Sequence, residues 1–305
     1  YGETPESVQV IVRQHLAPRL LGMDIFEVEA INRAMAVIAN NHTAKGAIDI
    51  CLYEAQAAAS GKTLLEHLNP PQRRVKVSFI LGMSSVEAML SEARAVYERG
   101  VRVLKVKVGR NFEHDLALVK TLQAEFAGSD LSLYADANEG LLPAEAPRQL
   151  AQLAELGMLY VEEPLPVELI AERAALRASR ALPLIADDSA FTPRDLAREL
   201  HFDTFDILNI KTARTGYTQS RQMLAAARAR GKGVMVGSQA SSTLGTIRAA
   251  IFAGLEGVNH PSELSFFLKL KDDIVNRPIE ISNGFINLDT LVDIAIDEQR
   301  LAAAR

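Results

Sequence analysis

Short apolar segments alternate with amphipathic helical segments from about residue 75 onward. The helical segments carry apolar positions at helical spacing, as in SVEAMLSEARAVYERG, where Gly100 is expected to end the helix. The repeating unit is therefore a strand followed by a helix. Such alternation indicates parallel pairing, and eight units favour a closed barrel. The predicted strands span residues 75–81, 101–108, 131–136, 158–162, 182–187, 205–211, 233–237 and 257–260. An open doubly wound sheet is the alternative, but LGMSSVEA after the first strand has no dinucleotide-binding fingerprint.

Residues 1–72 have a different pattern, with helical periodicity and no alternating strands. They are predicted to form a separate, mainly helical module, followed by the barrel at 73–283 and a C-terminal segment at 284–305 that returns to the module. SGKT at 60–63 is not a phosphate loop, since Gln56 stands where that motif requires glycine. Because the module must bury its apolar positions against the barrel, the C-terminal segment or another subunit, we expect a homo-oligomer.

Composition narrows the possible functions of the 305 residues. With 48% apolar residues the chain can build a large core, and its formal charge of -5 without a basic stripe disfavours nucleic acid or a membrane surface as partner. One cysteine, Cys51, excludes an internal disulfide framework, and no apolar run reaches the roughly 20 residues of a membrane span. A cytoplasmic location is expected.

Ionisable residues occur where successive predicted strands end. They are Lys105 and Lys107, Asp136, Glu162 with Glu163, Asp187 with Asp188, and Lys211. From Lys107 onward the spacing is 24 to 29 residues, about one strand and helix, so these groups should reach the same rim of the barrel. Asp136 and Asn138 in LYADANEG also suit a solvated turn, which remains an alternative for that stretch.

Lys105 and Lys107 share one face of their strand with Val103, since side chains two apart point the same way. A solvated lysine face is the usual interpretation of such a strand. In a barrel, however, the outer face must be apolar to meet the helices, so the lysines should point inward and need charged partners.

Asp136, Glu162 and Asp187 can supply those partners. Three carboxylates on adjacent strands offer the hard oxygen ligands that Mg²⁺ or Mn²⁺ prefers, and without a cation they would repel one another. The alternative is a structural ring of ion pairs that holds no metal.

The motifs KVK, DAN, EEP, ADD and NIK resemble the enolase superfamily, specifically its muconate-lactonizing (mandelate racemase/muconate cycloisomerase) subgroup. The resemblance implies a modified TIM barrel with a partial, mainly helical N-terminal capping domain. It implies Asp136, Glu162 and Asp187 as metal ligands, Lys107 as the base on one face of a small carboxylate substrate, Lys105 as its partner, and Lys211 on the opposite face. Glu263 in HPSELSFF would lie near the substrate, although a helix cap or surface acid is equally possible, and Asn138 would bind substrate. His260 is expected to be a strand-end histidine and no ligand.

Several positions depart from the pattern of the resembled family. Asp188 stands where glutamate is usual, Ser241 where the seventh-strand loop normally has glutamate, and Tyr217 where a second glycine is usual. A three-stranded meander with a substrate-covering loop, which precedes the corresponding segment in relatives, is not in this sequence.

The implied chemistry is abstraction of the proton alpha to a carboxylate, through an enediolate that the cation and Lys105 stabilise. Muconate cycloisomerase-like activity is the leading expectation. The motif NIKTARTG favours o-succinylbenzoate synthase or N-acylamino-acid racemase instead. A non-catalytic scaffold on the same fold is the alternative of another class.

Overall fold

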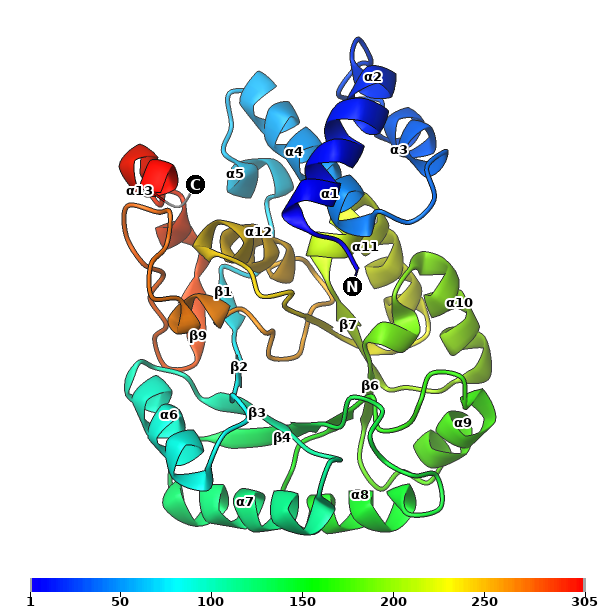
Figure 1. Cartoon of the computed structure of the whole chain (residues 1–305), viewed down its shortest axis with the longest axis vertical. Coiled ribbons are helices and arrows are strands. Elements are labelled where there is room, and N and C mark those ends of the chain that lie inside the picture. Colours follow the sequence, from blue (N-terminus) through cyan, green and yellow to red (C-terminus); the bar gives the residue numbers. More distant parts are fainter. Residues whose placement is uncertain (1, 304–305) are drawn as a thin grey trace.

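The computed structural model describes residues 2–303 of the chain. The regular elements before residue 69 are all helical, and Figure 1 shows them as a blue group beside α11 (Thr212–Ala229). Their bounds are α1 (Pro5–Val10), a π-helix (Ile11–Leu16), α2 (Ala17–Leu20), α3 (Val28–Ala36), α4 (His42–Ala59) and α5 (Leu64–Leu68). Capping boxes at Thr4 and Thr63 satisfy the free N–H groups at the starts of α1 and α5.

Seven parallel strands form a curved sheet in chain order, as the alternation of strands and helices predicts. They are β2 (Phe79–Ile80), β3 (Val103–Lys107), β4 (Ser132–Asp136), β5 (Val161–Glu162), β6 (Leu184–Ala186), β7 (Ile207–Ile210) and β8 (Gly233–Val236). The prediction of one strand at 75–81 is wrong, because β1 (Arg74–Lys76) turns away from β2 and pairs antiparallel with β9 (Phe285–Asn287).

The predicted eighth strand, 257–260, is not a regular strand. Instead, an extended segment slightly further along closes the barrel through backbone hydrogen bonds on both sides. Glu263 N donates to Val236 O at 2.8 Å, and Ser78 N donates to Ser262 O at 2.8 Å. The ladder is interrupted because Pro261 has no N–H and because Val234 N donates to the Asn259 side chain. The fold is therefore an (β/α)8-type barrel with an irregular eighth strand position.

Helices surround the sheet, as Figure 1 shows for the ring from α6 to α12. They are α6 (Val86–Glu98), α7 (Phe112–Glu125), α8 (Ala146–Glu155), α9 (Ile170–Ala178), α10 (Pro193–Phe202), α11 and α12 (Thr243–Ala253). On β3 the alternation predicted from the sequence is confirmed. Val103 packs in the cluster inside the barrel, whereas Leu104 and Val106 pack with residues of the outer helices, so Lys105 lies on the inner face.

The C-terminal part runs from short 3-10 turns to a last helix. After the turns Phe266–Lys269 and Leu288–Leu291 comes α13 (Glu298–Ala303). Leu291 and Ile294 belong to the same hydrophobic cluster as Leu65 of α5. These residues also line one cavity, so the C-terminal segment lies beside α5, while the domain boundaries at residues 72 and 283 stay a prediction.

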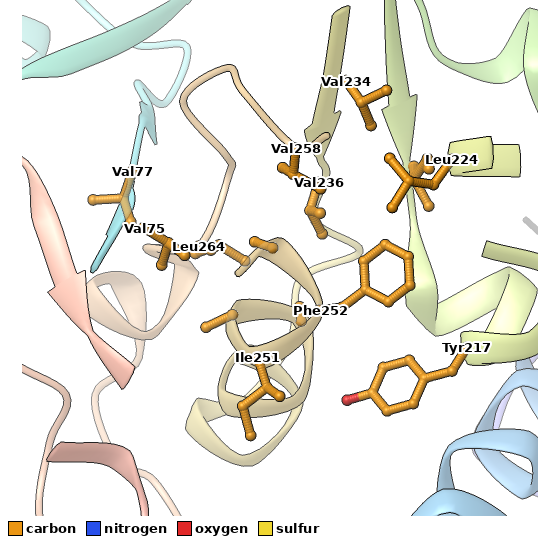
Figure 2. Packing of buried hydrophobic residues seen from close by; sticks show 14 of the residues in the cluster. Val75, Val77, Tyr217, Leu224, Val234, Val236, Ile251, Phe252, Val258 and Leu264 are labelled. Carbon is orange, nitrogen blue, oxygen red and sulfur yellow. The ribbon is translucent and has the colours of Figure 1, made fainter. Parts of the chain in front are cut away.

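Close packing of α4 on α11 joins the N-terminal helices to the barrel. A Cβ atom on Gly46 would lie 2.6 Å from Ala213 O, so this helix contact requires glycine. Tyr217 of α11 contacts Tyr53 of α4 edge-on, and Figure 2 shows it beneath Phe252 of α12, with the Tyr217 and Phe252 rings stacked at 5.7 Å between centroids. Within residues 2–303, no helix combines the length and apolar character needed to cross a membrane.

Candidate active site

The ends of five neighbouring strands bring the predicted ionisable groups together. Lys107 is paired in register with Asp136, and Asp136 with Glu162. Asp187 and Lys211 come directly after β6 and β7, one residue beyond the last strand residue in each case. The rim predicted from the spacing of these residues is therefore present in the folded chain.

Lys105 is enclosed by carboxylates in the interior of the barrel. Its Nζ lies 2.9 Å from Asp136 Oδ2, 2.9 Å from Glu162 Oε2 and 2.5 Å from Glu263 Oε1, and its side chain is 3% exposed. Burial alone would lower the pKa of Lys105, but the three carboxylates outweigh it and raise the pKa well above its ordinary value. Lys105 is therefore a fixed positive charge.

Lys107 lies on the same face but nearer to solvent, with 26% of its side chain exposed. Its Nζ donates to Asp136 Oδ2 at 2.6 Å and to Asn138 Oδ1 at 2.5 Å. Burial raises the pKa of Asp136, but Lys105 and Lys107 outweigh this and hold it at about 2. Asn138 N also donates to Asp136 Oδ1 at 3.0 Å, a bond typical of Asp in turns, but Asp136 itself is buried, so this stretch is not a solvated turn.

Lys211 is bonded to the carboxylate on the other side of the rim. Its Nζ donates to Asp187 Oδ2 at 2.5 Å, and both side chains are more than nine-tenths buried. Burial lowers the pKa of Lys211, but Asp187, Glu263 and Glu162 together raise it above the ordinary value. Arg214 donates to Asp187 O at 3.0 Å and to Asp188 Oδ1 at 2.8 Å, so the short side chain of Asp188 still has a partner.

Glu263 is neither a helix cap nor a surface acid. It is 3% exposed, its Oε1 accepts from Lys105 and from Tyr134 Oη at 3.2 Å, and its Oε2 accepts from Ser238 N at 3.0 Å. His260 lies apart from this group, edge-on to Tyr160, and burial lowers its pKa. The structure thus brings Glu263 into the rim network and leaves His260 out.

Three buried residues of the network were not predicted from the sequence. Asn209 Nδ2 donates to Glu162 Oε1 at 3.3 Å, Tyr134 bonds Glu263, and Arg214 bonds the Asp187 loop. Strand parity could have identified two of them, since Tyr134 shares the inner face with Asp136 and Asn209 shares it with Lys211. Arg214 follows the strand in a helix, where parity gives no signal.

Family profiles match both parts of the chain. One described as "Enolase C-terminal domain-like" covers residues 88–293, and one described as "Mandelate racemase / muconate lactonizing enzyme, N-terminal domain" covers residues 1–68. The chain belongs to the enolase superfamily, in its muconate-lactonizing subgroup. This confirms the resemblance found in the rim motifs.

Individual relatives agree with this assignment to the enolase superfamily. The structure of a muconate lactonizing enzyme from Mycobacterium smegmatis in complex with muconolactone is 34% identical and superposes with a TM-score of 0.91, over 99% of this chain and 84% of that one. L-Ala-D/L-Glu epimerase of Bacillus subtilis is 29% identical over 292 residues, 94% of this chain and 80% of the relative. Muconate cycloisomerase 1 of Rhodococcus opacus is 28% identical over 293 residues, 94% and 78% of the two chains. The chain is an isomerase-type enzyme of this superfamily.

The rim of this enolase-superfamily barrel fits a divalent cation by its chemistry. Within residues 2–303, no three His, Cys, Asp or Glu side chains form a ready metal cluster, and the Lys105 ammonium group lies between Asp136 and Glu162 instead. Glu162 is fully buried, and burial raises its pKa well above the usual range although Lys105 Nζ lies 2.9 Å from its Oε2. Buried carboxylate oxygens gathered in one place are the hard donors that Mg²⁺ or Mn²⁺ prefers, so Asp136, Glu162 and Asp187 fit such an ion.

A cavity of about 510 Å³ lies at the outer edge of this site. Lys107 and Asn138 form part of its wall, together with apolar side chains of α6 and α7 such as Met89 and Leu118. Lys107 is thus the rim lysine that faces open space, in agreement with its greater exposure.

Proposed function

We propose that the chain is a metal-dependent isomerase or lyase that removes the proton alpha to a substrate carboxylate through an enediolate intermediate, with muconate cycloisomerase-like activity. The observation that carries this proposal is the position of two lysines on opposite parts of one rim with carboxylates between them: Lys107 at the end of β3 and Lys211 just after β7. After a proton is abstracted from one face of a carbon, a proton can be returned from the other face, or the negative charge of the intermediate can be stabilised from there.

Each charged side chain has a distinct role in this proposal. Mg²⁺ or Mn²⁺ held by Asp136, Glu162 and Asp187 would supply positive charge to the substrate carboxylate. Lys105, fixed by three carboxylates, adds a permanent positive charge beside the developing negative charge. Lys107, the more exposed of the two β3 lysines, must be deprotonated to accept the proton.

Lys211 has the complementary task on the other face. As a buried ammonium group bonded to Asp187, it can stabilise charge or donate a proton to the intermediate. Asn138 holds Lys107 by a hydrogen bond, and Glu263 holds Lys105. We also propose that Asn138 and Glu263 contact the substrate.

A racemase or epimerase reaction is the second candidate. It is favoured by the presence of a lysine on each side of the rim and by relatives named L-Ala-D/L-Glu epimerase and N-succinylamino acid racemase. In such a reaction both lysines move a proton, whereas in a cycloisomerase or an o-succinylbenzoate synthase one lysine only contributes charge.

The first experiment combines metal binding with a substrate panel. Calorimetry with Mg²⁺ and Mn²⁺ should show binding to the wild-type chain that Asp136→Asn abolishes or greatly weakens. Activity should then be compared on cis,cis-muconate, N-succinylamino acids and an L-Ala-Glu dipeptide. A chain that binds neither metal and turns over none of these carboxylates would support the non-catalytic scaffold.

A further inference from the structure

Glu163 is a buried carboxylate next to the proposed ligand Glu162 that the chemistry above does not use. It is 3% exposed, and its φ of +36° lies in the left-handed region that glutamate rarely adopts. Side chains of adjacent strand residues point to opposite faces, so Glu162 points into the barrel and Glu163 points toward α9 and α10. An unusual backbone and a buried charge at one position indicate that the surrounding structure holds Glu163 for a reason.

The carboxylate of Glu163 is bonded to the loop that carries Asp187. Ser189 N donates to Oε2 at 2.9 Å, Ser189 Oγ donates to Oε1 at 2.7 Å, and Asp187 N lies 3.3 Å from Oε1. These bonds hold both ends of the short turn that begins at Asp187. Glu163 therefore holds the backbone that carries the Asp187 carboxylate, while Lys211 and Arg214 contact the carboxylate itself.

A second layer of charge holds Glu163 in turn. Arg173 Nη2 lies 3.4 Å from Glu163 Oε1, and Arg173 Nη1 donates to Glu199 Oε2 at 2.7 Å. Arg198 also donates to Ser189 O at 3.0 Å, so the backbone of Ser189 is held from two sides. Because Arg173 and Glu199 are almost fully buried, this network fixes the loop against α9 and α10 with little freedom.

We propose that Glu163 is a positioning residue, which acts through Ser189 and the Asp187 amide to hold the Asp187 carboxylate at the rim for a divalent cation. The inference rests on the proposed function, since it concerns a proposed metal ligand. Groups that orient metal ligands typically contribute a factor of about 10 to 100 to metal affinity or activity. Glu163 is not assigned a catalytic role.

The test measures Mn²⁺ affinity by calorimetry and unfolding temperature in the presence of a chelator. Glu163→Ala should weaken Mn²⁺ binding about 10- to 100-fold. Ser189→Ala removes one of the bonds without exposing a buried charge, and it should weaken binding by about three- to tenfold. Glu163→Gln keeps one acceptor oxygen but places an NH₂ group against a donor of the Asp187 loop, so it should weaken binding by about three- to tenfold without leaving a cavity.

Glu139→Ala is the matched control. Glu139 also follows a rim strand with a positive φ, of +64°, and its carboxylate holds a neighbouring loop through Val167 N at 3.1 Å. It is bonded to no proposed ligand, so its loss should leave Mn²⁺ affinity unchanged.

The outcomes separate the two proposals. If the wild type binds Mn²⁺ and both Glu163→Ala and Ser189→Ala bind it equally well, the positioning role is wrong and Glu163 serves stability alone. The same conclusion follows if Glu139→Ala weakens binding as much as Glu163→Ala. If Glu163→Ala does not fold, Ser189→Ala and Glu163→Gln carry the test. A wild type that binds no metal contradicts the proposed function itself, and the inference falls with it.

Discussion

The two sides of the rim hold their lysines in different ways. On the β3 and β4 side, Lys105 and Lys107 share Asp136, which is paired in register with Lys107 on the adjacent strand. On the β6 and β7 side, Asp187 and Lys211 both lie just beyond their strands. Their positions depend on loops and helix starts that hydrogen bonds from other parts of the chain hold in place.

Asp49 of α4 makes such hydrogen bonds from a segment that is distant in sequence. Its Oδ2 accepts from Tyr217 N at 2.6 Å and from Thr218 N at 2.8 Å. α11 is kinked at Gly216, whose φ of 60° and ψ of -167° are not helical, so Asp49 provides the N-terminal cap that Gly216 lacks. The N-terminal helices are therefore bonded to the early turns of α11, the helix that follows Lys211. Strand register positions one lysine, and a contact between distant segments helps to position the other.

The largest expected effect is on turnover, from removing either lysine. Lys107→Ala and Lys211→Ala should each lower kcat by about 10²- to 10⁴-fold, the usual contribution of a general acid or base. In deuterium oxide, a racemising enzyme should keep proton exchange of one enantiomer in one variant and of the opposite enantiomer in the other. Full activity of Lys211→Ala would mean that the rim is a structural ring of ion pairs.

Removing Asp187 or Asp136, the carboxylate that holds the lysines on each side of the rim, should lower the free energy of unfolding by different amounts. In a chelator, Asp187→Asn removes the buried carboxylate that Lys211 and Arg214 both contact, and we expect a loss of about 3 kcal/mol. Asp136→Asn leaves Lys105 with Glu162 and Glu263, and Lys107 can turn to solvent, so about 1 kcal/mol should be lost. Urea unfolding measures both values, and equal losses would contradict the difference between the sides.

The capping contact can be tested against a matched carboxylate on the other side. Asp49→Ala should cost about 2 kcal/mol of unfolding free energy and should lower the proton exchange that depends on Lys211. Asp115 Oδ2 accepts from Gly109 N at 2.8 Å in the loop after Lys107, and Asp115→Ala should cost about 1 kcal/mol and affect Lys107 instead. Urea unfolding and enantiomer-specific exchange would check both. An equal effect of Asp49→Ala on the two exchange reactions would show that α4 is coupled to the whole rim.

Asn138→Ala should have the smallest effect. Lys107 loses one hydrogen bond but keeps Asp136, so we expect a decrease in kcat/KM of about three- to tenfold, equivalent to one modest hydrogen bond. Steady-state kinetics on the best substrate provides the measurement. A loss as large as that of Lys107→Ala would assign Asn138 a direct part in the reaction.

The sequence predicted the parallel barrel and the five rim positions from Lys107 to Lys211, because these features depend on the local alternation of strands and helices. Strand alternation decides which side chains point inward, and the ends of parallel strands meet at one edge, so regular spacing is enough to place Asp136 and Glu162. The same parity could have predicted Tyr134 and Asn209.

Only the tertiary structure decided the contacts between segments that no regular spacing relates. Glu263 reaches Lys105 because an irregular segment closes the barrel, which the prediction of a regular strand at 257–260 did not anticipate. The bonds from Asp49 to Tyr217 and from Glu163 to Ser189 depend on how helices and loops pack, and sequence periodicity carries no record of that packing. Periodicity thus determined which groups reach the rim, whereas closure of the barrel and docking of the N-terminal helices determined which partners hold them there.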